Sequence, residues 1–534
     1  MKKCLKKWIS VILTLCMILT LAACGTKDNT QTGTDTDAAD TSTDTGADAT
    51  DSGEEKVLRM SRNYENATSW DPLTHSDATT MFLAPQIYEP LFHLDMDGGS
   101  VPWLATSYEV SDDQLTYTIK LQEGVQFHGG YGEMTSEDVK FSIERNNDEA
   151  VGSLCIELLN MPNIASIDTP DDYTVVFNLN GPDLDFITRL SDFQATVISK
   201  KYVDEVGLEG LTKAPIGTGP FEYVSGTPGV ESEAKAFEDY WGGRPDIDRI
   251  TYTMISDTNT NFTAFENGEI DLVYVHYPDK VNEFKDKGYI PYYLPTPQLL
   301  YLYLNMQNEP LDDPLVREAI FTAIDPNYFN DSLFYGTESI PTGWMPAGVK
   351  YSLQDYFYPE YNVEKAKELL AEAGYPDGLK LTLWSVNDDI SPPPCLILEQ
   401  QLKEVGITLE LQLVDFNVFM EQVRAGTAPL AVLYNGASVI SDADMARYRS
   451  EEYPGRNWVG LTNKEYDDLI EKALASYDVE EKTEYFYDAQ RLFMDLDLMY
   501  PITTYGYYFM TSPKVHDIDL WGDLAPRLYK ATMD

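Results

Sequence analysis

The chain has 534 residues with a formal net charge of −50 at pH 7, and apolar residues make up 43% of it. This composition is typical of a globular protein, and the length allows two or three domains. Such an acidic surface repels nucleic acid and anionic lipid headgroups, so neither is expected as a partner. The charge does not identify a ligand, because a pocket can differ from the average surface.

The first 24 residues have the three zones of a bacterial export signal. Lysines near the start form a basic head, an apolar core spans 11–21, and two alanines precede Cys24. The apolar stretch of about 16 residues is shorter than the ~20 that a bilayer-spanning helix needs. Cysteine after Leu-Ala-Ala resembles the lipobox of bacterial lipoproteins, which implies a diacylglycerol on the Cys24 sulfur. A plain secretory signal and an uncleaved anchor are the alternatives, and all three place the body outside the cytoplasmic membrane.

Residues 25–55 are almost entirely Thr, Asp, Ala, Gly and Ser. Such a segment cannot bury enough apolar surface to offset the entropy lost on ordering, so we expect it to be disordered. As a flexible coil of this length it would span about 30 Å, and its excess of acids favours more extended shapes. The segment is therefore predicted to be an acidic tether between the anchor and the body.

The body, residues 56–534, is predicted to contain both strands and helices. Runs that alternate with a period of two predict strands, whereas capping and stop signals mark the ends of helices. In chain order we expect a strand at 56–62, a helix at 79–91, a strand–turn–strand unit at 101–125, a helix from Ser136, a strand at 173–178, a helix at 364–373, a strand at 379–384, a helix at 395–405, a strand at 407–414, and helices at 464–476 and 480–496. The strand–helix–strand alternation near the middle of this series indicates α/β layers.

No motif of known catalytic or cofactor chemistry stands out in the sequence. It contains no Gly-x-x-x-x-Gly-Lys-Ser/Thr phosphate loop, no His-Glu-x-x-His zinc motif and no Gly-x-Ser-x-Gly nucleophile motif. The histidines are scattered singly, which gives no metal-site pattern. Cys155 and Cys395 are the cysteines outside the signal, and we expect two independent thiols, with a disulfide as the alternative. No catalytic site, metal or cofactor is therefore predicted.

Short motifs follow one another along most of the body. They are IYEPL at 87–91 with VPWLA at 101–105, GVQFHGG at 124–130 with TSEDV at 135–139, PIGTGPF at 215–221, DYWGGRP at 239–245, GEID at 268–271, YLYLN at 301–305, VREA at 316–319 with AID at 323–325, and the helical segment 366–374. In this order they resemble the extracytoplasmic solute-binding proteins of bacterial ABC importers, specifically the peptide/nickel (oligopeptide- and dipeptide-binding) family, family 5. We interpret most of them as structural, with 217–220 as a tight turn and 240–243 as an aromatic plug over a turn.

The resemblance implies an α/β fold with two lobes. It would be a periplasmic-binding-protein-like fold of type II, with an extra subdomain in the first lobe and a ligand cleft between the lobes. The first lobe would comprise 56–297 plus 506–534, and the second would comprise 298–505. Closure around a ligand would be a hinge motion, for which the candidate segments are 299–304 and 501–508.

The resemblance also gives a candidate ligand site. Family members that bind free peptides hold the α-amine with an aspartate in a W-x-GD-x-x-DPD stretch, and the corresponding region here is YNGASVISDAD at 434–444. The simplest alignment puts Ala437 at that aspartate, which disfavours short free peptides, because a buried ammonium without a counter-charge costs several kcal/mol. Asp442 or Asp444 would substitute if the loop is shifted; otherwise both are acids at a helix N-terminus. The candidate ligand-binding residues are Trp384, Tyr434, Asn435, Gly436, Ala437, Asp442 and Asp444.

Three functions are consistent with these features. The leading one is the substrate-binding component of an ABC importer, which captures an oligopeptide-class solute and delivers it to the permease. The second is an oligosaccharide receptor on the same scaffold, because Ala437 is no counter-charge and because the 36 Tyr and 8 Trp allow an aromatic cleft that Trp384 and Tyr434 would face. The third is a lipid-anchored extracellular hydrolase, which no motif supports.

The leading function implies a set of partners and a location. The partners would be a small solute, the permease and its ATPase subunits, with no nucleic acid and with membrane contact only through the N-terminal lipid. The protein would be a monomeric, palmitate-bearing lipoprotein on the extracytoplasmic face of the cell membrane. The identity and length of the ligand, the permease and the exact hinge residues stay open.

Overall fold

The computed structural model describes residues 55–62, 69–74, 83–96, 98–156, 158–356, 358–436, 442–522 and 525–534. The signal, Cys24, nearly all of the tether and Ala437 lie outside these ranges. Residues Glu55–Asp534 form one compact unit of their own.

A mixed seven-stranded sheet forms the base of the first lobe. Its strands lie in the order β10 (Phe221–Thr227), β11 (Glu231–Ala236), β12 (Arg249–Met254), β1 (Val57–Arg62), β13 (Leu272–Val275), β20 (Tyr507–Thr511) and β14 (Ile290–Leu294). Among these strands only β1 runs parallel to both of its neighbours. Alternate residues of β1, Leu58 and Met60, enter the core beside Ile250 and Tyr252 of β12, as the period of two in a strand requires. The helices of this part are α4 (Lys200–Lys213), α5 (Thr258–Glu266) and α6 (Pro278–Asp286).

The carboxylate of Asp271 ties the middle of this sheet together. It is fully buried and accepts a hydrogen bond from Arg59 Nε on β1 at 2.7 Å. Lys514 Nζ, just beyond β20, lies 2.9 Å from its other oxygen. Asp271 is the last residue of the GEID motif, so this motif holds strands together.

A four-stranded antiparallel sheet forms a second layer of the first lobe. Its strand order is β4 (Ala105–Val110), β5 (Thr116–Leu121), β9 (Thr174–Leu179) and β8 (Ile164–Asp171). The helices beside it are α2 (Ser136–Glu144) and α3 (Phe186–Arg189). Helix α2 begins as its sequence predicts, because the Thr135 N–H donates to Asp138 Oδ2 at 2.9 Å in a capping box. Short two-stranded ladders join β2 (Phe92–Leu94) to β3 (Ser100–Pro102), β6 (Gln126–Phe127) to β7 (Gly132–Glu133), β21 (Val515–His516) to β24 (Thr532–Met533), and β22 (Asp519–Leu520) to β23 (Pro526–Arg527).

The second lobe is built on a five-stranded sheet with helices on both faces. Its strand order is β17 (Ile407–Val414), β16 (Leu379–Val386), β18 (Leu430–Gly436), β15 (Gln298–Leu304) and β19 (Met499–Thr504). Along β15, Leu300, Leu302 and Leu304 pack against one helical layer, whereas Tyr301 and Tyr303 pack against the other. A strand buried on both faces reads as a continuous apolar run, which explains the YLYLN motif. The helices are α7 (Pro314–Thr322), α8 (Pro326–Phe334), α9 (Val363–Glu372), α10 (Pro392–Glu404), α11 (Phe416–Arg424), α12 (Asp442–Ala446), α13 (Lys464–Ala475) and α14 (Val479–Met494).

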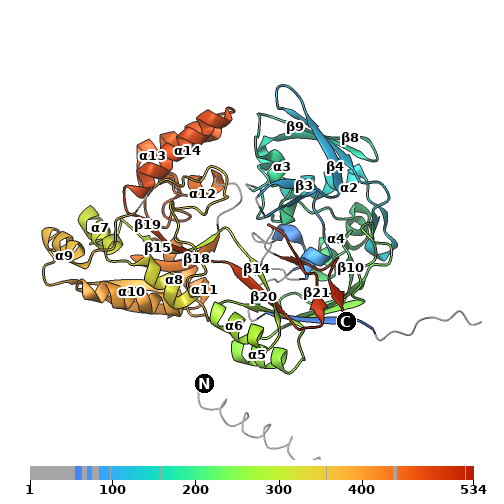
Figure 1. Ribbon diagram of the computed structural model, residues 1–534. Coiled ribbons are helices and arrows are strands. Elements are labelled where there is room, and N and C mark those ends of the chain that lie inside the picture. The colour runs from blue at the N-terminus through green and yellow to red at the C-terminus, as the bar shows by residue number, and fades with distance from the viewer. Residues whose placement is uncertain are drawn as a thin grey trace, which may run out of the picture. The chain divides into compact units, whose positions relative to one another are not determined.

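The chain passes between the two main sheets at two places. Residues 295–297 join β14 of the seven-stranded sheet to β15 of the five-stranded sheet, and residues 505–506 join β19 back to β20. Figure 1 shows the resulting arrangement, in which the sheet of β15, β18 and β19 and the sheet of β14 and β20 belong to different lobes. This confirms the predicted two-lobed α/β fold.

With one exception, the helices and strands that the sequence predicts agree with the observed ones to within one to three residues. The helix expected at 79–91 is wrong for the described residues 83–91, where only Ala84–Gln86 form a 3-10 turn. Pro85 and Pro90 lie in this segment, and proline cannot donate the hydrogen bonds of a continuing helix. Cys155 and Cys395 are both buried and are not joined by a disulfide, which confirms the prediction of independent thiols.

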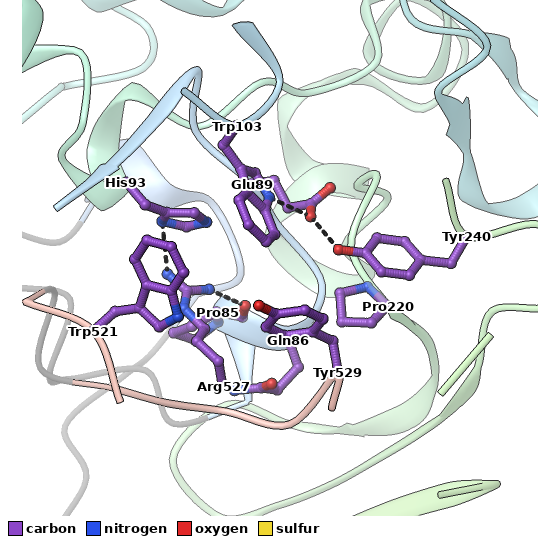
Figure 2. Close-up of a pocket in the computed structure, with 10 residues that line it drawn as sticks. All are labelled: Pro85, Gln86, Glu89, His93, Trp103, Pro220, Tyr240, Trp521, Arg527 and Tyr529. Carbon is purple, nitrogen blue, oxygen red and sulfur yellow. Dashed lines mark hydrogen bonds between the residues drawn. The ribbon is translucent and has the colours of Figure 1, made fainter. Parts of the chain in front are cut away.

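Four of the family-like motifs meet at the carboxylate of Glu89 (Figure 2). Glu89 is 2% exposed and accepts a hydrogen bond at one oxygen from Trp103 Nε1 at 2.7 Å and from the Tyr240 hydroxyl at 2.8 Å. Its other oxygen accepts from the Thr218 hydroxyl at 2.7 Å and from Trp241 Nε1 at 3.1 Å. Burial raises the pKa of Glu89, and the four donors oppose that rise. The motifs IYEPL, VPWLA, PIGTGPF and DYWGGRP therefore share one structural role.

We predict that Glu89→Ala lowers the free energy of unfolding by at least about 3 kcal/mol, because each buried donor left without an acceptor costs about 1–3 kcal/mol. Glu364→Ala is the control, since that side chain is 82% exposed. Chemical denaturation of both variants measures the difference. Equal stabilities of the two variants would contradict the role of Glu89.

His128 links the GVQFHGG motif to the PIGTGPF turn. The ring is fully buried; its Nε2 lies 2.9 Å from the Gly219 carbonyl oxygen, and the Gly217 N–H donates to Nδ1 at 3.4 Å. This pattern assigns the proton of the neutral ring to Nε2. A Cβ at Gly217 would lie 2.1 Å from the Ile87 carbonyl oxygen, so only glycine allows the turn to pack this closely. Burial lowers the pKa of His128 to about 4.

We predict that His128 makes the fold lose stability as the pH falls from about 6.5 to about 4. Its folded pKa of about 4 is depressed below the ordinary value of about 6.5, so its stabilising contribution is present above pH 6.5 and is lost on the way down. The full loss corresponds to about 3 kcal/mol. Chemical denaturation at several pH values checks this, with His128→Gln as the comparison. If the free energy of unfolding changed with pH equally in the two proteins over this range, the result would contradict the prediction.

Candidate functional site

The candidate site lies where the crossing segment 505–506 brings residues of both lobes together. The rings of Tyr434 on β18 and Tyr505 in the crossing lie 4.4 Å apart between centroids. The Tyr505 hydroxyl lies 3.2 Å from the Tyr274 hydroxyl of β13 and 2.7 Å from His276 Nδ1. These contacts connect the end of β18 in the second lobe with the end of β13 in the first.

One positive charge lies beside this cluster. The guanidinium of Arg62, the last residue of β1, lies over the Tyr274 ring at 5.2 Å from its centroid. Burial lowers the pKa of His276 to about 3, and the charge of Arg62 acts in the same direction, so the imidazole is neutral at pH 7. Among the residues that the structure describes, the cluster therefore combines neutral hydrogen-bonding groups with the cation of Arg62, which suits a polar solute that carries an acidic group.

The structure brings Tyr434, Asn435 and Gly436 together at the end of β18. Asn435 Nδ2 donates to the Tyr303 hydroxyl at 3.1 Å, and Gly436 pairs with Gln298 at the start of β15. Trp384 is paired with Ala431, so it lies about 10 Å from Tyr434 along the sheet. Its ring is partly buried against the core of the second lobe. The expected pair of cleft-facing aromatics is thus separated, and Tyr434 is the one at the lobe boundary.

Asp442 and Asp444 both lie in the first turn of α12. Asp442 Oδ2 accepts a hydrogen bond at 2.6 Å from Arg189 of the first lobe. Asp444 lies 3.0 Å from Arg447 on its own segment. Each carboxylate therefore faces an arginine, and a ligand ammonium at either position would compete with that arginine.

A pocket in the first lobe surrounds Glu89 and is a structural site (Figure 2). Its cavity volume of about 10 Å³ is the space of about one water molecule. Arg527 donates to the Pro85 carbonyl and lies 3.5 Å from His93 Nδ1, and the rings of Trp103 and Trp521 pack at 5.5 Å. The pocket therefore joins the C-terminal tail to the IYEPL segment and leaves no room for a solute.

Several residues at the lobe boundary were not among the candidate ligand-binding residues predicted from the sequence. They lie in or directly after strands whose apolar and aromatic character predicts a core, and a single histidine or arginine at a strand end gives no motif. They are Arg62, Tyr274, His276, Tyr277 and Tyr505. A cation at the carboxyl end of a parallel strand, as for Arg62, is the one signal that could have pointed to a ligand.

The described residues contain neither a candidate metal cluster nor a candidate membrane-spanning helix. No group of three or more His, Cys, Asp or Glu side chains in this part of the chain could hold a metal ion. Within the same residues, no helix is long and apolar enough to cross a membrane.

Comparison with known proteins identifies the same scaffold. The sequence pattern of the family described as bacterial extracellular solute-binding proteins, family 5 (middle region), matches residues 100–454. The glutathione-binding protein GsiB of Escherichia coli K12 is 32% identical over 437 residues, which cover 80% of this chain and 84% of that protein.

Two solved structures illustrate the similarity of the fold. The periplasmic binding protein DppA of Helicobacter pylori, in complex with the peptide STSA, has a TM-score of 0.76 and 26% identity over 89% of this chain and 98% of its own. NikA of Brucella suis, in complex with Fe(III)-EDTA, has a TM-score of 0.79 and 26% identity over 90% of this chain and 100% of its own.

Proposed function

Because the chain belongs to the family 5 bacterial extracellular solute-binding proteins, we propose that its solute is a short peptide-class molecule that carries a carboxylate. The protein is the substrate-binding component of an ABC importer and delivers its solute to the permease. The observation that carries the proposed ligand class is the 32% identity to a glutathione-binding protein over 80% of the chain.

The geometry supports an acidic peptide-class ligand at the lobe boundary. Arg62 would attract the carboxylate, while Tyr434, Asn435 and Gly436 would line the second-lobe side, with Ala437 next along the chain. Asp442 and Asp444 would hold the ligand ammonium less well, because each faces an arginine at 2.6–3.0 Å. Trp384 would at most line the edge of the site, since it pairs with Ala431, about 10 Å from Tyr434 along the sheet.

The proposed lobes are residues 56–297 with 506–534 and residues 298–505. We expect them to close around the solute by bending at the two crossings, which connect the lobes through only a few residues each. An oligosaccharide receptor gains less support, because Trp384, one of the two aromatic residues expected to face the cleft, lies beside Ala431 and away from Tyr434. We expect no turnover of the bound solute.

We predict that a short acidic peptide raises the unfolding temperature of the full chain in detergent. A ligand present at a free concentration of 100 times its Kd adds ~2.7 kcal/mol to the free energy of unfolding. The panel contains reduced glutathione, dipeptides and tripeptides, maltooligosaccharides and Fe(III)-EDTA, and differential scanning fluorimetry is the measurement. Asn435→Ala should weaken the effect about tenfold in ligand concentration, because one hydrogen bond to a buried polar group is worth about 1 kcal/mol or more.

The control for that variant is Asn259→Ala, on an exposed position of α5, which should bind as the unchanged chain does. Stabilisation by oligosaccharides alone would contradict the peptide assignment and favour the sugar receptor. Ligand consumption that one carboxylate substitution abolishes would instead reveal a hydrolase.

We also propose that Cys24 carries the lipid that anchors the protein to the cell membrane. The support is the Leu-Ala-Ala-Cys sequence after a basic head and a short apolar core. An importer receptor gains from staying near its permease, and two or more acyl chains give stable anchoring where one does not. The acidic tether would then set how far the monomeric body can move from the membrane.

We predict that Cys24→Ala releases the protein from the membrane fraction into the medium or periplasm. The thioether to the lipid cannot form without the sulfur, and the apolar stretch is too short to span the bilayer. Fractionation and immunoblotting measure the distribution. Retention of the variant in the membrane would point to an uncleaved anchor.

A further inference from the structure

Helix α3 of the first lobe faces α12 and α14 of the second (Figure 1). Six charged side chains meet across this boundary. Asp183, Asp185 and Arg189 come from the first lobe, and Lys350, Asp442 and Lys482 come from the second. They carry three negative and three positive charges in total. We call these six residues the interlobe latch.

Arg189 forms one half of the interlobe latch. Its Nε donates to Asp183 Oδ2 within the first lobe at 3.0 Å. A second nitrogen donates to Asp442 Oδ2 across the boundary at 2.6 Å. The Arg189 side chain is 6% exposed, so this pair is shielded from solvent.

Asp185 forms the other half and is fully buried. One oxygen accepts a hydrogen bond from Lys350 Nζ. The other accepts from the Tyr351 hydroxyl at 3.2 Å and lies 3.7 Å from Lys482 Nζ. All three partners belong to the second lobe, so separation of the lobes would remove every one of them from this carboxylate.

The charge distribution favours the closed arrangement. The first-lobe members have two acids and one cation, and the second-lobe members have one acid and two cations, so the lobes attract each other at this edge. Buried pairs are strong only when both partners stay in place, and removing one partner leaves an unpaired buried charge. When the lobes separate, each group returns to water and to dissolved salt, which screens the attraction.

We propose that the interlobe latch is a closing device that holds the lobes together and sets how often they open. By holding the lobes together it would control the release of a solute enclosed between them. The latch depends on contacts between the two lobes and on no assumption about the ligand.

Hydrogen-exchange mass spectrometry of the full chain without added solute tests the proposal. We expect Asp185→Asn and Lys350→Met to raise the exchange rates of segments 181–191 and 349–353 by about tenfold or more, because each removes the ion pair between Lys350 and the buried Asp185 carboxylate. Raising NaCl from low to high concentration should speed exchange in the unchanged chain and have less effect in the variants. Asp468→Asn, which breaks an exposed pair with Lys464, is the matched control and should leave both segments unchanged.

Two results would overturn the proposal. One is unchanged exchange of both segments in both latch variants when their melting temperatures equal that of the control. The other is faster exchange throughout the chain in Asp185→Asn together with unchanged exchange in Lys350→Met, which would reveal a folding role for Asp185 alone. Because no solute is added, both results test the interlobe latch whether or not the solute is a peptide.

Discussion

The relation between the two lobes depends on two short covalent crossings. Residues 295–297 and 505–506 join strands that are hydrogen-bonded within their own sheets. Because β14 and β20 are neighbours in one sheet and β15 and β19 are neighbours in the other, the crossings lie side by side and form a narrow connection. Motion at such a connection changes the lobe arrangement without breaking either sheet, which is the physical requirement for hinge closure.

Everything else that touches both lobes is non-covalent and therefore reversible. On the crossing side, Tyr434 packs on Tyr505, whose hydroxyl contacts His276 of the first lobe. Between α3 and α12 the contacts are charged, with Arg189 bound to Asp442. Aromatic packing tolerates small rotations, whereas a hydrogen-bonded ion pair depends on the placement of both partners.

Buried carboxylates explain why the sequence motifs are recognisable at all. Glu89 accepts four hydrogen bonds, and Asp271 forms ion pairs with an arginine and a lysine. In both cases the partners come from distant segments of the chain. A buried charge whose partner is lost is costly, so donor and acceptor must be retained together. These constraints bear on the scaffold of the first lobe, and the ligand can differ among proteins that share it.

The sequence alone determined the fold class, most helices and strands, and the family. Local signals were sufficient there: period-two strands such as 407–414, the capping box before Ser136, and the glycine that ends the helix at Glu372 each depend on neighbours in the chain. Over the described residues 83–91 the expected helix failed because Pro85 and Pro90 interrupt it. Trp384 and Tyr434 were equivalent candidates for a place in the cleft, because the sequence does not give the register of the strands. The register puts Tyr434 at the lobe boundary and Trp384 away from it. Only the tertiary structure showed that Asp442 pairs with Arg189, because 253 residues separate them and no local pattern records a contact across two lobes.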